Sequence, residues 1–300
     1  MNHMCSAGRS SRHARAATTV AALLTTLTGH TLAASGDVLS AMLIDETLTP
    51  RKVTLVGFDG NQVIFLDQQG LERRIGQDRL TALVAIEAST DLRDGLGAAA
   101  HRAFDGFETA PDPSASAASG LVRLVDGRRF PGESEPSPSF EETVIWHHQR
   151  FGELRIPLDA ISALMQAGWQ GWHDAATDHD TPVEDELYLL NGDVLRGFLV
   201  GLSDPVEFET GDDIVELETG RIGGIRLANA PETISGMVVW LNDGTVATLD
   251  RIASRQDRNL VLTLPEGQAG VYEVSEVRGL AFDAARIRPL AALTPDSQEP

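Results

Sequence analysis

Residues 121–132 read LVRLVDGRRFPG, and residues 187–197 read LYLLNGDVLRG. Each stretch alternates apolar and polar residues, contains an Asp-Gly or Asn-Gly pair, and carries a second glycine after a short polar segment. Alternation with a period of two is typical of β-strands, and an Asn-Gly or Asp-Gly pair between such segments is the strongest short signal of a β-hairpin. Residues 237–249, MVVWLNDGTVATL, repeat the first half of the pattern. Three such hairpins in one chain predict a repeated β unit.

Each hairpin is followed by a second block of similar design, with a strand, a glycine turn, another strand and a closing apolar segment. The three blocks span residues 144–164, 206–227 and 260–282. Residues 53–86 form a fourth copy, whose first strand is expected at residues 41–44. In this copy Asp45-Glu46 replaces the glycine turn. The chain therefore contains four copies of a unit of about five short strands.

Units of this size predict an all-β fold of tandem small barrels of the Sm-like or SH3-like kind. One large β-sandwich assembled from the same hairpins is the alternative. The copies resemble one another over the whole unit and not only in the hairpin, which favours the barrels. The predicted copies span residues 35–87, 121–165, 186–228 and 236–283.

Linkers separate these copies. Residues 88–120 contain a short, weakly helical stretch and then a Pro/Ala/Ser-rich segment that is typical of flexible linkers. Residues 166–185 form an acidic linker, and residues 284–300 form a tail. Only residues 228–235 lie between the third and fourth copies, so we expect those two copies to pack as a pair.

Residues 1–34 have the layout of a signal peptide. Arg9, Arg12 and Arg15 precede an apolar stretch that ends in small residues, which is the order of a basic segment, a hydrophobic segment and a cleavage site. A transmembrane anchor is the alternative, but threonines and a glycine interrupt the stretch, and it falls short of the roughly 20 apolar residues that a span needs. We therefore expect a periplasmic or secreted protein with no integral membrane span in the mature chain. The single cysteine, Cys5, lies in the basic segment, so the mature chain would contain no disulfide.

The chain is strongly acidic. Its 300 residues carry 24 Lys and Arg against 44 Asp and Glu, which gives a formal net charge of -20. A surface of this charge repels nucleic acid and anionic membranes. Nucleic acid is therefore excluded as a partner. The 42% of hydrophobic residues is enough to build folded cores.

No motif in the sequence predicts catalysis, a cofactor or a metal. Nucleophile elbows, zinc-protease helices, phosphate loops and calcium loops have recognisable patterns, and none of them occurs. Five side chains in the acidic linker carry groups that can ligate a divalent cation: His173, Asp174, Asp178, His179 and Asp180. Their spacing fits no known binding loop, so a solvated linker is the preferred interpretation. We therefore predict no catalytic residues, no metal site and no cofactor.

Neighbouring polar residues in the predicted strands are also weak candidates. His147 and His148 point to opposite faces of a strand and cannot chelate one ion, so we expect one to be half-buried and the other exposed. The carboxylate pairs are interpreted as groups that keep hairpin edges soluble and not as acid–base catalysts. These pairs are Glu141-Glu142, Asp212-Asp213 and Glu216 with Glu218.

Two tryptophans are the candidate ligand-binding residues. Trp169 and Trp172 lie three residues apart in the acidic linker, where exposed rings could stack on sugar rings. The alternative is a lid packed over the end of the second unit. Trp146 and Trp240 lie in strand alternation and are predicted to belong to the core.

Three stretches carry a resemblance to a known family: residues 121–133, residues 144–164 and residues 187–217. They resemble the tandem barrel region of secreted planctomycete-type bacterial proteins, which often precedes an NPCBM carbohydrate-binding module. The similarity covers most of residues 41–300, and the sequence ends about where that module would begin. The family region has no established catalytic residues, so the resemblance implies none here.

Two functions from different classes follow. The preferred one is a non-catalytic exported binding or scaffold protein whose small β-barrel repeats contact other envelope proteins. The alternative is a carbohydrate-associated binding protein of the cell envelope, with polysaccharide as its partner.

Overall fold

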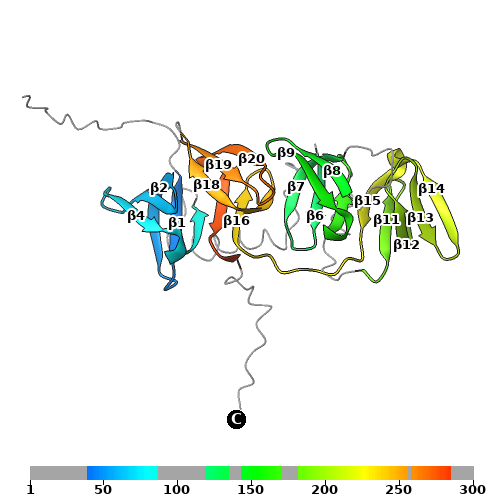
Figure 1. Cartoon of the computed structure of the whole chain (residues 1–300), viewed down its shortest axis with the longest axis horizontal. Coiled ribbons are helices and arrows are strands. Elements are labelled where there is room, and N and C mark those ends of the chain that lie inside the picture. The colour runs from blue at the N-terminus through cyan, green and yellow to red at the C-terminus, as the bar shows by residue number, and fades with distance from the viewer. Residues whose placement is uncertain (1–38, 87–118, 135–142, 170–181, 256–257, 285–300) are drawn as a thin grey trace, which may run out of the picture. The chain divides into compact units, whose positions relative to one another are not determined.

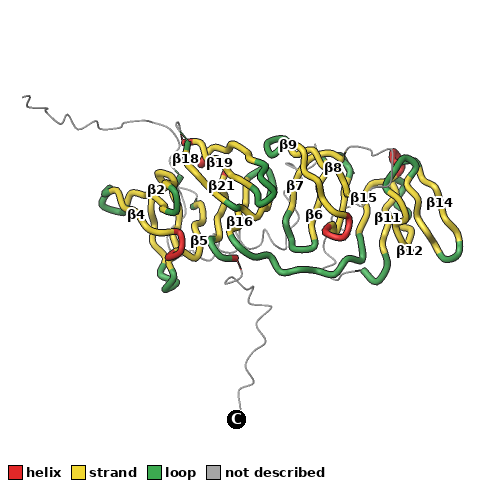
Figure 2. Tube along the Cα trace, in the orientation of Figure 1, coloured by secondary structure: helices red, strands yellow, loops and turns green. Residues whose placement is uncertain are grey.

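The computed structural model describes residues 39–86, 119–134, 143–169, 182–255 and 258–284. All of them belong to one compact unit, Asp37–Pro300. Strands joined by short loops make up most of this part of the chain, and single 3₁₀ turns are its only helical elements (Figure 2). The predicted all-β class is confirmed.

The strands fall into four copies of one arrangement (Figure 1). The first copy contains β1 (Ser40–Asp45), β2 (Pro50–Asp59), β3 (Gln62–Leu66), β4 (Glu72–Gly76) and β5 (Leu80–Ala85). The second contains β6 (Gly120–Leu124), β7 (Arg129–Ser134), β8 (Thr143–His148), β9 (Gly152–Pro157) and β10 (Ile161–Met165). The third contains β11 (Asp185–Leu189), β12 (Val194–Gly201), β13 (Val206–Thr210), β14 (Asp213–Leu217) and β15 (Ile222–Arg226). The fourth contains β16 (Met237–Leu241), β17 (Val246–Leu249), β18 (Arg251–Ser254), β19 (Asn259–Thr263), β20 (Ala269–Glu273) and β21 (Val277–Ala281), so that its second strand is split in two.

In the first three copies the strands pair antiparallel in the order fourth, third, second, first, fifth. In the fourth copy β17, β16 and β21 pair in the same way, and β18, β19 and β20 form a separate three-stranded sheet. In the first three copies the second strand pairs with both the first and the third. In all four copies a 3₁₀ turn leads into the last strand: η1 (Gln77–Arg79), η3 (Leu158–Ala160), η4 (Thr219–Arg221) and η6 (Val274–Glu276). The fourth strand pairs on one side only among the described strands, so the ladder of hydrogen bonds does not close into a barrel.

The predicted hairpins have the same turn in the second, third and fourth copies. Gly127, Gly192 and Gly244 adopt φ angles of 87°, 93° and 91°, a region that glycine enters without steric cost. The residue before each glycine fixes the turn with its side chain, because an Asp or Asn oxygen accepts the N–H two residues on at 2.8–3.1 Å. The Asp-Gly and Asn-Gly pairs therefore specify these hairpins directly.

The second glycine of the motif allows the second strand to pass close to the third. A Cβ atom at Gly197 would lie 1.8 Å from the carbonyl oxygen of Glu209, and one at Gly132 would lie 2.2 Å from that of His147. Real Cβ atoms do not approach backbone this closely, so only glycine fits.

The copies are joined through their fifth strands. Strand β5 of the first copy pairs with β21 of the fourth, and β10 of the second pairs with β15 of the third. The expectation that the third and fourth copies pack as a pair is therefore wrong: their fifth strands bond to other copies. The short connector contacts the second copy, where Asn229 Nδ2 donates to the carbonyl oxygens of Leu158 and Ile161 at 2.9 and 2.7 Å.

One further strand contact links the two pairs of copies. Val246 of β17 lies opposite Arg129 of β7. Direct partners can consequently be followed without a break through β2, β1, β5, β21, β16, β17, β7, β6, β10, β15, β11 and β12. We call these strands the continuous sheet.

One face of the continuous sheet lies in the apolar core. A cross-strand row of buried residues faces the core in each pair of copies. The row contains Leu43, Leu83, Leu280, Val239 and Ala247 in the first and fourth copies, and Phe130, Val122, Leu164, Ile225 and Leu187 in the second and third. The predicted core positions of Trp146 and Trp240 are confirmed, with 2% and 4% exposure.

Candidate functional site

Only part of the predicted site lies in the described residues. Trp172, the histidine and aspartate group at 173–180, and Glu141-Glu142 all fall outside them. Among the residues that the structure describes, no group of three or more His, Cys, Asp and Glu side chains could hold a metal ion. No helix in the same residues is long and apolar enough to cross a membrane.

Trp169 packs on the third copy. Its ring covers Gly223 and Gly224 of β15, where an added Cβ would lie 2.6 and 2.8 Å from the indole. The ring of Tyr188 is 5.4 Å away, centroid to centroid, and tilted by 49°. Because the two glycines have no side chains, the Trp169 ring packs directly on the backbone of β15. Trp169 is half-buried.

The two adjacent histidines have different environments. His147 is exposed and His148 is buried, as strand alternation requires. His148 Nδ1 accepts the N–H groups of Arg150 and Phe151, each at 3.1 Å. Its Nε2 therefore carries the proton and donates to Thr245 Oγ1 at 3.0 Å, across the contact between the second and fourth copies.

Burial lowers the pKa of His148, and the nearby Arg150 lowers it further, while Asp243 opposes the shift. Arg150 also pairs with Glu276 of the fourth copy and lies over the ring of Tyr272, 4.7 Å from its centroid. These groups hold the second and fourth copies together.

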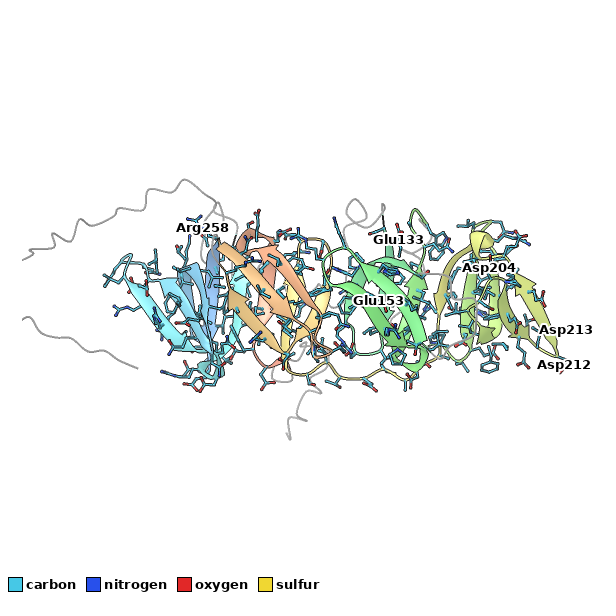
Figure 3. The ribbon with its side chains drawn as sticks, turned by 45° about the horizontal axis from the view of Figure 1, so that its top comes forward. Glu133, Glu153, Asp204, Asp212, Asp213 and Arg258 are labelled. Carbon is cyan, nitrogen blue, oxygen red and sulfur yellow. The ribbon has the colours of Figure 1, made fainter. Side chains whose placement is uncertain are left out.

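The carboxylate pairs lie on the surface. Asp212 and Asp213 lie at the tip of the β13–β14 hairpin (Figure 3), and Glu216 and Glu218 are exposed. Their positions agree with a role in keeping strand edges soluble.

A row of arginines crosses the face of the continuous sheet opposite the core. Arg129, Arg123, Ala163, Arg226, Glu186 and Arg196 follow one another as direct cross-strand partners. Direct partners in an antiparallel pair point to the same face. We call these six positions the arginine row. Sequence analysis missed it because the row exists only once β10 and β15 are paired.

In the third-copy half of the arginine row, one carboxylate pairs with two arginines. Arg226 Nη1 donates to Glu186 at 3.0 Å, and Arg196 Nε donates to the same carboxylate at 3.3 Å. The Tyr188 hydroxyl donates to Glu186 at 2.7 Å. Burial and this hydrogen bond raise the pKa of Tyr188.

The second-copy half of the row is different. Burial lowers the pKa of Arg123, and the positive charge of Arg226 lowers it further. Burial, Arg123 and Arg278 lower the pKa of Arg129 to about 10. Arg123 is half-buried, and its guanidinium has no ion pair or hydrogen bond with any residue that the structure describes. Burial and the charge of neighbouring arginines thus act in the same direction on both arginines of this half of the row.

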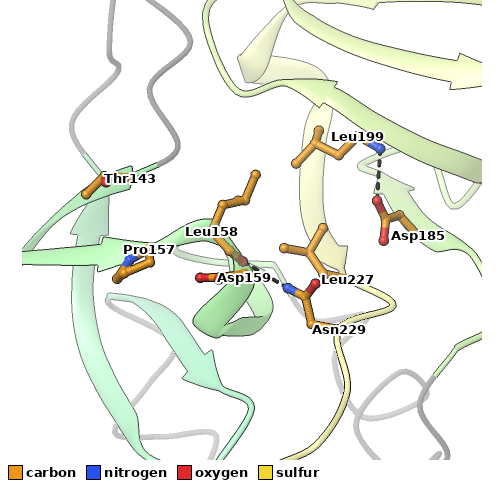
Figure 4. A pocket seen from close by; sticks show the side chains of 8 residues that line it. All are labelled: Thr143, Pro157, Leu158, Asp159, Asp185, Leu199, Leu227 and Asn229. Carbon is orange, nitrogen blue, oxygen red and sulfur yellow. Dashed lines mark hydrogen bonds between the residues drawn. The ribbon is translucent and has the colours of Figure 1, made fainter.

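A cleft of about 690 Å³ lies between the second and third copies (Figure 4). It is lined by Thr143, Pro157, Leu158, Asp159, Asp185, Leu199, Leu227 and Asn229. The Asp185 carboxylate accepts the N–H groups of Leu199 and Ala228 at 2.9 and 2.7 Å. Its oxygens are thus used to fix the backbone, whereas Asp159 is exposed. This arrangement favours a structural role for the cleft over an acid–base pair.

An apolar pair is exposed on the outer part of the third copy. Phe198 of β12 and Ile214 of β14 are 55% and 60% exposed. Both lie opposite Glu209 of β13, one on each side, so the three side chains share one face. Among the described strands β14 pairs only with β13, which leaves this three-stranded sheet with a free edge.

Comparison with known proteins gives no match. No protein family, no curated protein and no solved structure matches the chain.

Proposed function

We propose that the chain is a non-catalytic exported binding or scaffold protein, and that each copy is a small barrel of the Sm-like or SH3-like kind. The observation that carries the proposal is the exposed pair Phe198 and Ile214 beside the free edge of β14. Exposed apolar side chains beside an unpaired strand are suited to a partner protein that adds a strand or covers the face.

The barrel proposal rests on strand order and bending. In every copy the first strand pairs with the second and the last, and a 3₁₀ turn precedes the last strand. The first three copies have five strands, and their second strand pairs with both the first and the third. The close approach at Gly132 and Gly197 lets the second strand bend from one half to the other. Strong bending of a short five-stranded sheet is how small barrels enclose a core.

The export proposal rests on residues 1–34, whose basic and apolar segments have signal-peptide order. The intact mass of the protein from its native cells tests it. We expect a mass below that of the full chain by the mass of the leader, and a mass that retains residues 1–34 would contradict export with cleavage.

Partner capture tests the binding role. The protein is immobilised and exposed to an envelope extract of the source cells, in parallel with Phe198→Glu and with Leu71→Glu as a matched control. Leu71 is also an exposed apolar residue, at 49%, but lies in the first copy. We expect a partner that binds the unchanged protein and the control and is lost with Phe198→Glu. Equal capture by all three proteins, or capture by none, would contradict this surface as the binding site.

A second candidate function is carbohydrate-associated binding, supported by the Trp169 and Tyr188 rings next to the arginine row. Aromatic rings bind the apolar faces of sugars. A panel of envelope polysaccharides is titrated while tryptophan fluorescence is followed, with Trp169→Leu as the variant. A change that disappears in the variant supports this function, and unchanged fluorescence with every polysaccharide contradicts it.

A further inference from the structure

Strand β14 has backbone groups that no other described strand pairs with. The β13–β14 hairpin has a two-residue loop, and the first residue of this loop, Gly211, has a φ angle of 65°, as in a type II′ turn. In such a turn Thr210 and Asp213 bond to each other, and the bonding then alternates along the strand. The N–H and C=O groups of Ile214 and Glu216 therefore point away from β13, toward the free edge.

All the charges around this edge are negative. From Gly197 to Gly220 the chain contains seven Asp and Glu residues and no Lys or Arg. Glu207 and Glu216 are direct cross-strand partners, and like charges placed directly opposite each other are destabilising. No residue that the structure describes forms an ion pair or a hydrogen bond with either carboxylate. A cation beside Glu216 would relieve this repulsion.

The corresponding edges of the other three copies contain an arginine or bond to one. Strand β4 contains Arg73 and Arg74, and β9 contains Arg155. On β20 the carbonyl oxygen of Val271 accepts a hydrogen bond from Arg150 Nη1 of the second copy at 2.8 Å. Cationic side chains on an edge strand are a common protection against unwanted strand addition. Among these four edges of the described chain, only β14 neither contains an arginine nor bonds to one.

We propose that β14 pairs with an extended, basic segment of a partner protein, which adds one strand to the third copy. This inference rests on the binding role proposed above and names the kind of partner that binds there. Main-chain hydrogen bonds to Ile214 and Glu216 provide affinity, and the cross-strand side chains provide specificity. The acidic edge of a second copy of the chain is repelled, so the partner is a different, basic chain.

The side chains of β14 determine which residues the partner segment carries. Asp213, Ile214, Val215 and Glu216 follow one another along the strand, and Ile214 is 60% exposed. Residues that lie opposite one another on neighbouring strands point to the same face of a sheet, so their side chains meet. The complementary segment therefore has the order basic, apolar, apolar, basic. This order reads the same in both directions, so it suits either strand direction.

Three labelled hexapeptides test this order, with binding to the full-length protein followed by fluorescence anisotropy. Thr-Arg-Val-Val-Arg-Thr carries the proposed order, Thr-Val-Arg-Arg-Val-Thr has the same composition in another order, and Thr-Glu-Val-Val-Glu-Thr has the charges reversed. We expect the first peptide to bind about tenfold or more tightly than the second, because only its side chains match those of β14. The third should not bind. Equal binding by the first two would show attraction by charge alone and would overturn strand addition.

Backbone methylation tests the hydrogen bonds. Two further forms of the first peptide carry N-methyl groups on one or the other set of alternate backbone nitrogens. Only one set faces the neighbouring strand in a sheet, so we expect one form to lose binding and the other to retain it. Binding that survives in both forms would contradict pairing with β14.

Matched variants locate the peptide on β14. Glu216→Gln removes a carboxylate from this edge, whereas Glu72→Gln removes one from β4, the corresponding strand of the first copy. Both side chains are exposed, so we expect both variants to fold. We expect Glu216→Gln to weaken binding of the first peptide about threefold or more, as for a surface ion pair, and Glu72→Gln to leave it unchanged. No binding by the unchanged protein, or equal binding by Glu216→Gln, would refute the proposal.

Sedimentation equilibrium tests a second copy of the chain as the occupant. We expect a monomer. A dimer that is lost in Ile214→Pro, which has no N–H to offer at this edge, would assign the edge to self-association and overturn the proposal.

Partner capture separates this inference from the proposed binding role. If capture that depends on Phe198 persists while no peptide binds, the partner covers the face and only strand addition is wrong. If the first peptide binds and no partner is captured, the recognition of basic strands stands and the scaffold role falls.

Discussion

Leu83 of the first copy lies directly opposite Leu280 of the fourth, and Leu164 of the second copy lies directly opposite Ile225 of the third. The four residues occupy equivalent positions in the fifth strands of their copies, and each pair has one paired residue on either side in the same register. The two joints are therefore the same contact, made twice with approximate two-fold symmetry. A fifth strand that pairs with its own first strand on one edge and another fifth strand on the other explains how separate copies form one sheet.

Truncation of a joint residue should destabilise the protein. Leu280 is 1% exposed and lies in the core at the first–fourth joint. Leu280→Ala is expected to lower the free energy of unfolding by about 2–5 kcal/mol, because it removes buried methyl groups and leaves a cavity. Urea unfolding measures the change. Leu190→Ala, at a leucine that is 55% exposed, should change it by less than about 0.5 kcal/mol, and equal effects of the two substitutions would argue against the joint.

Substitution of the second motif glycine should disrupt the strand crossing. Gly197→Ala would place a Cβ 1.8 Å from the carbonyl oxygen of Glu209, and the backbone must shift to relieve this contact. We expect a loss of folding stability of about 3 kcal/mol or more. Gly220→Ala is the control, because nothing lies within 4 Å of a Cβ there. Thermal unfolding compares the two, and a Gly197→Ala protein as stable as the control would show that β12 does not pass close to β13.

Acid should weaken the contact between the second and fourth copies. Folding lowers the pKa of His148 below its usual value of 6.5, so the unfolded chain binds a proton more readily than the folded one. Stability from neutral His148 is full above about pH 6.5 and is lost as the pH falls through the folded value. Denaturant unfolding between pH 7.5 and pH 5 measures this loss.

His148→Asn and His147→Asn provide the comparison. The first should be less stable at pH 7.5 and should lose less stability on acidification, because its side chain does not titrate. The second, at an exposed position, should keep the pH dependence of the unchanged protein. A profile that is altered by His147→Asn and not by His148→Asn would contradict the assignment.

Local features of the fold could be predicted from sequence because short-range chemistry determines them. The aspartate or asparagine before Gly127, Gly192 and Gly244 accepts the N–H two residues on, and this contact lies within the motif itself. The burial of Trp146 and the opposite environments of His147 and His148 follow from strand alternation.

The pairing of the copies could not be predicted in this way. The fifth strands are all short and apolar, with Leu83, Leu164, Ile225 and Leu280 at equivalent positions. Nothing in one strand identifies its partner in another copy, and the short connector suggested the wrong pair. The arginine row depends on the same pairing, so the sequence alone did not indicate that Arg123 belongs to it.

Engineered disulfides test the pairing of the copies most directly. Ala82 lies opposite Ala281, and Ala163 lies opposite Arg226, within the distance that a disulfide between neighbouring strands can span. In a protein with Cys5→Ser, the pairs Ala82→Cys with Ala281→Cys and Ala163→Cys with Arg226→Cys should each form an intramolecular disulfide, measured by mass spectrometry after digestion. The control pair Arg226→Cys with Ala281→Cys joins the third and fourth copies and should remain reduced. A disulfide in the control pair, with none in the other two, would contradict the nested pairing of first with fourth and second with third.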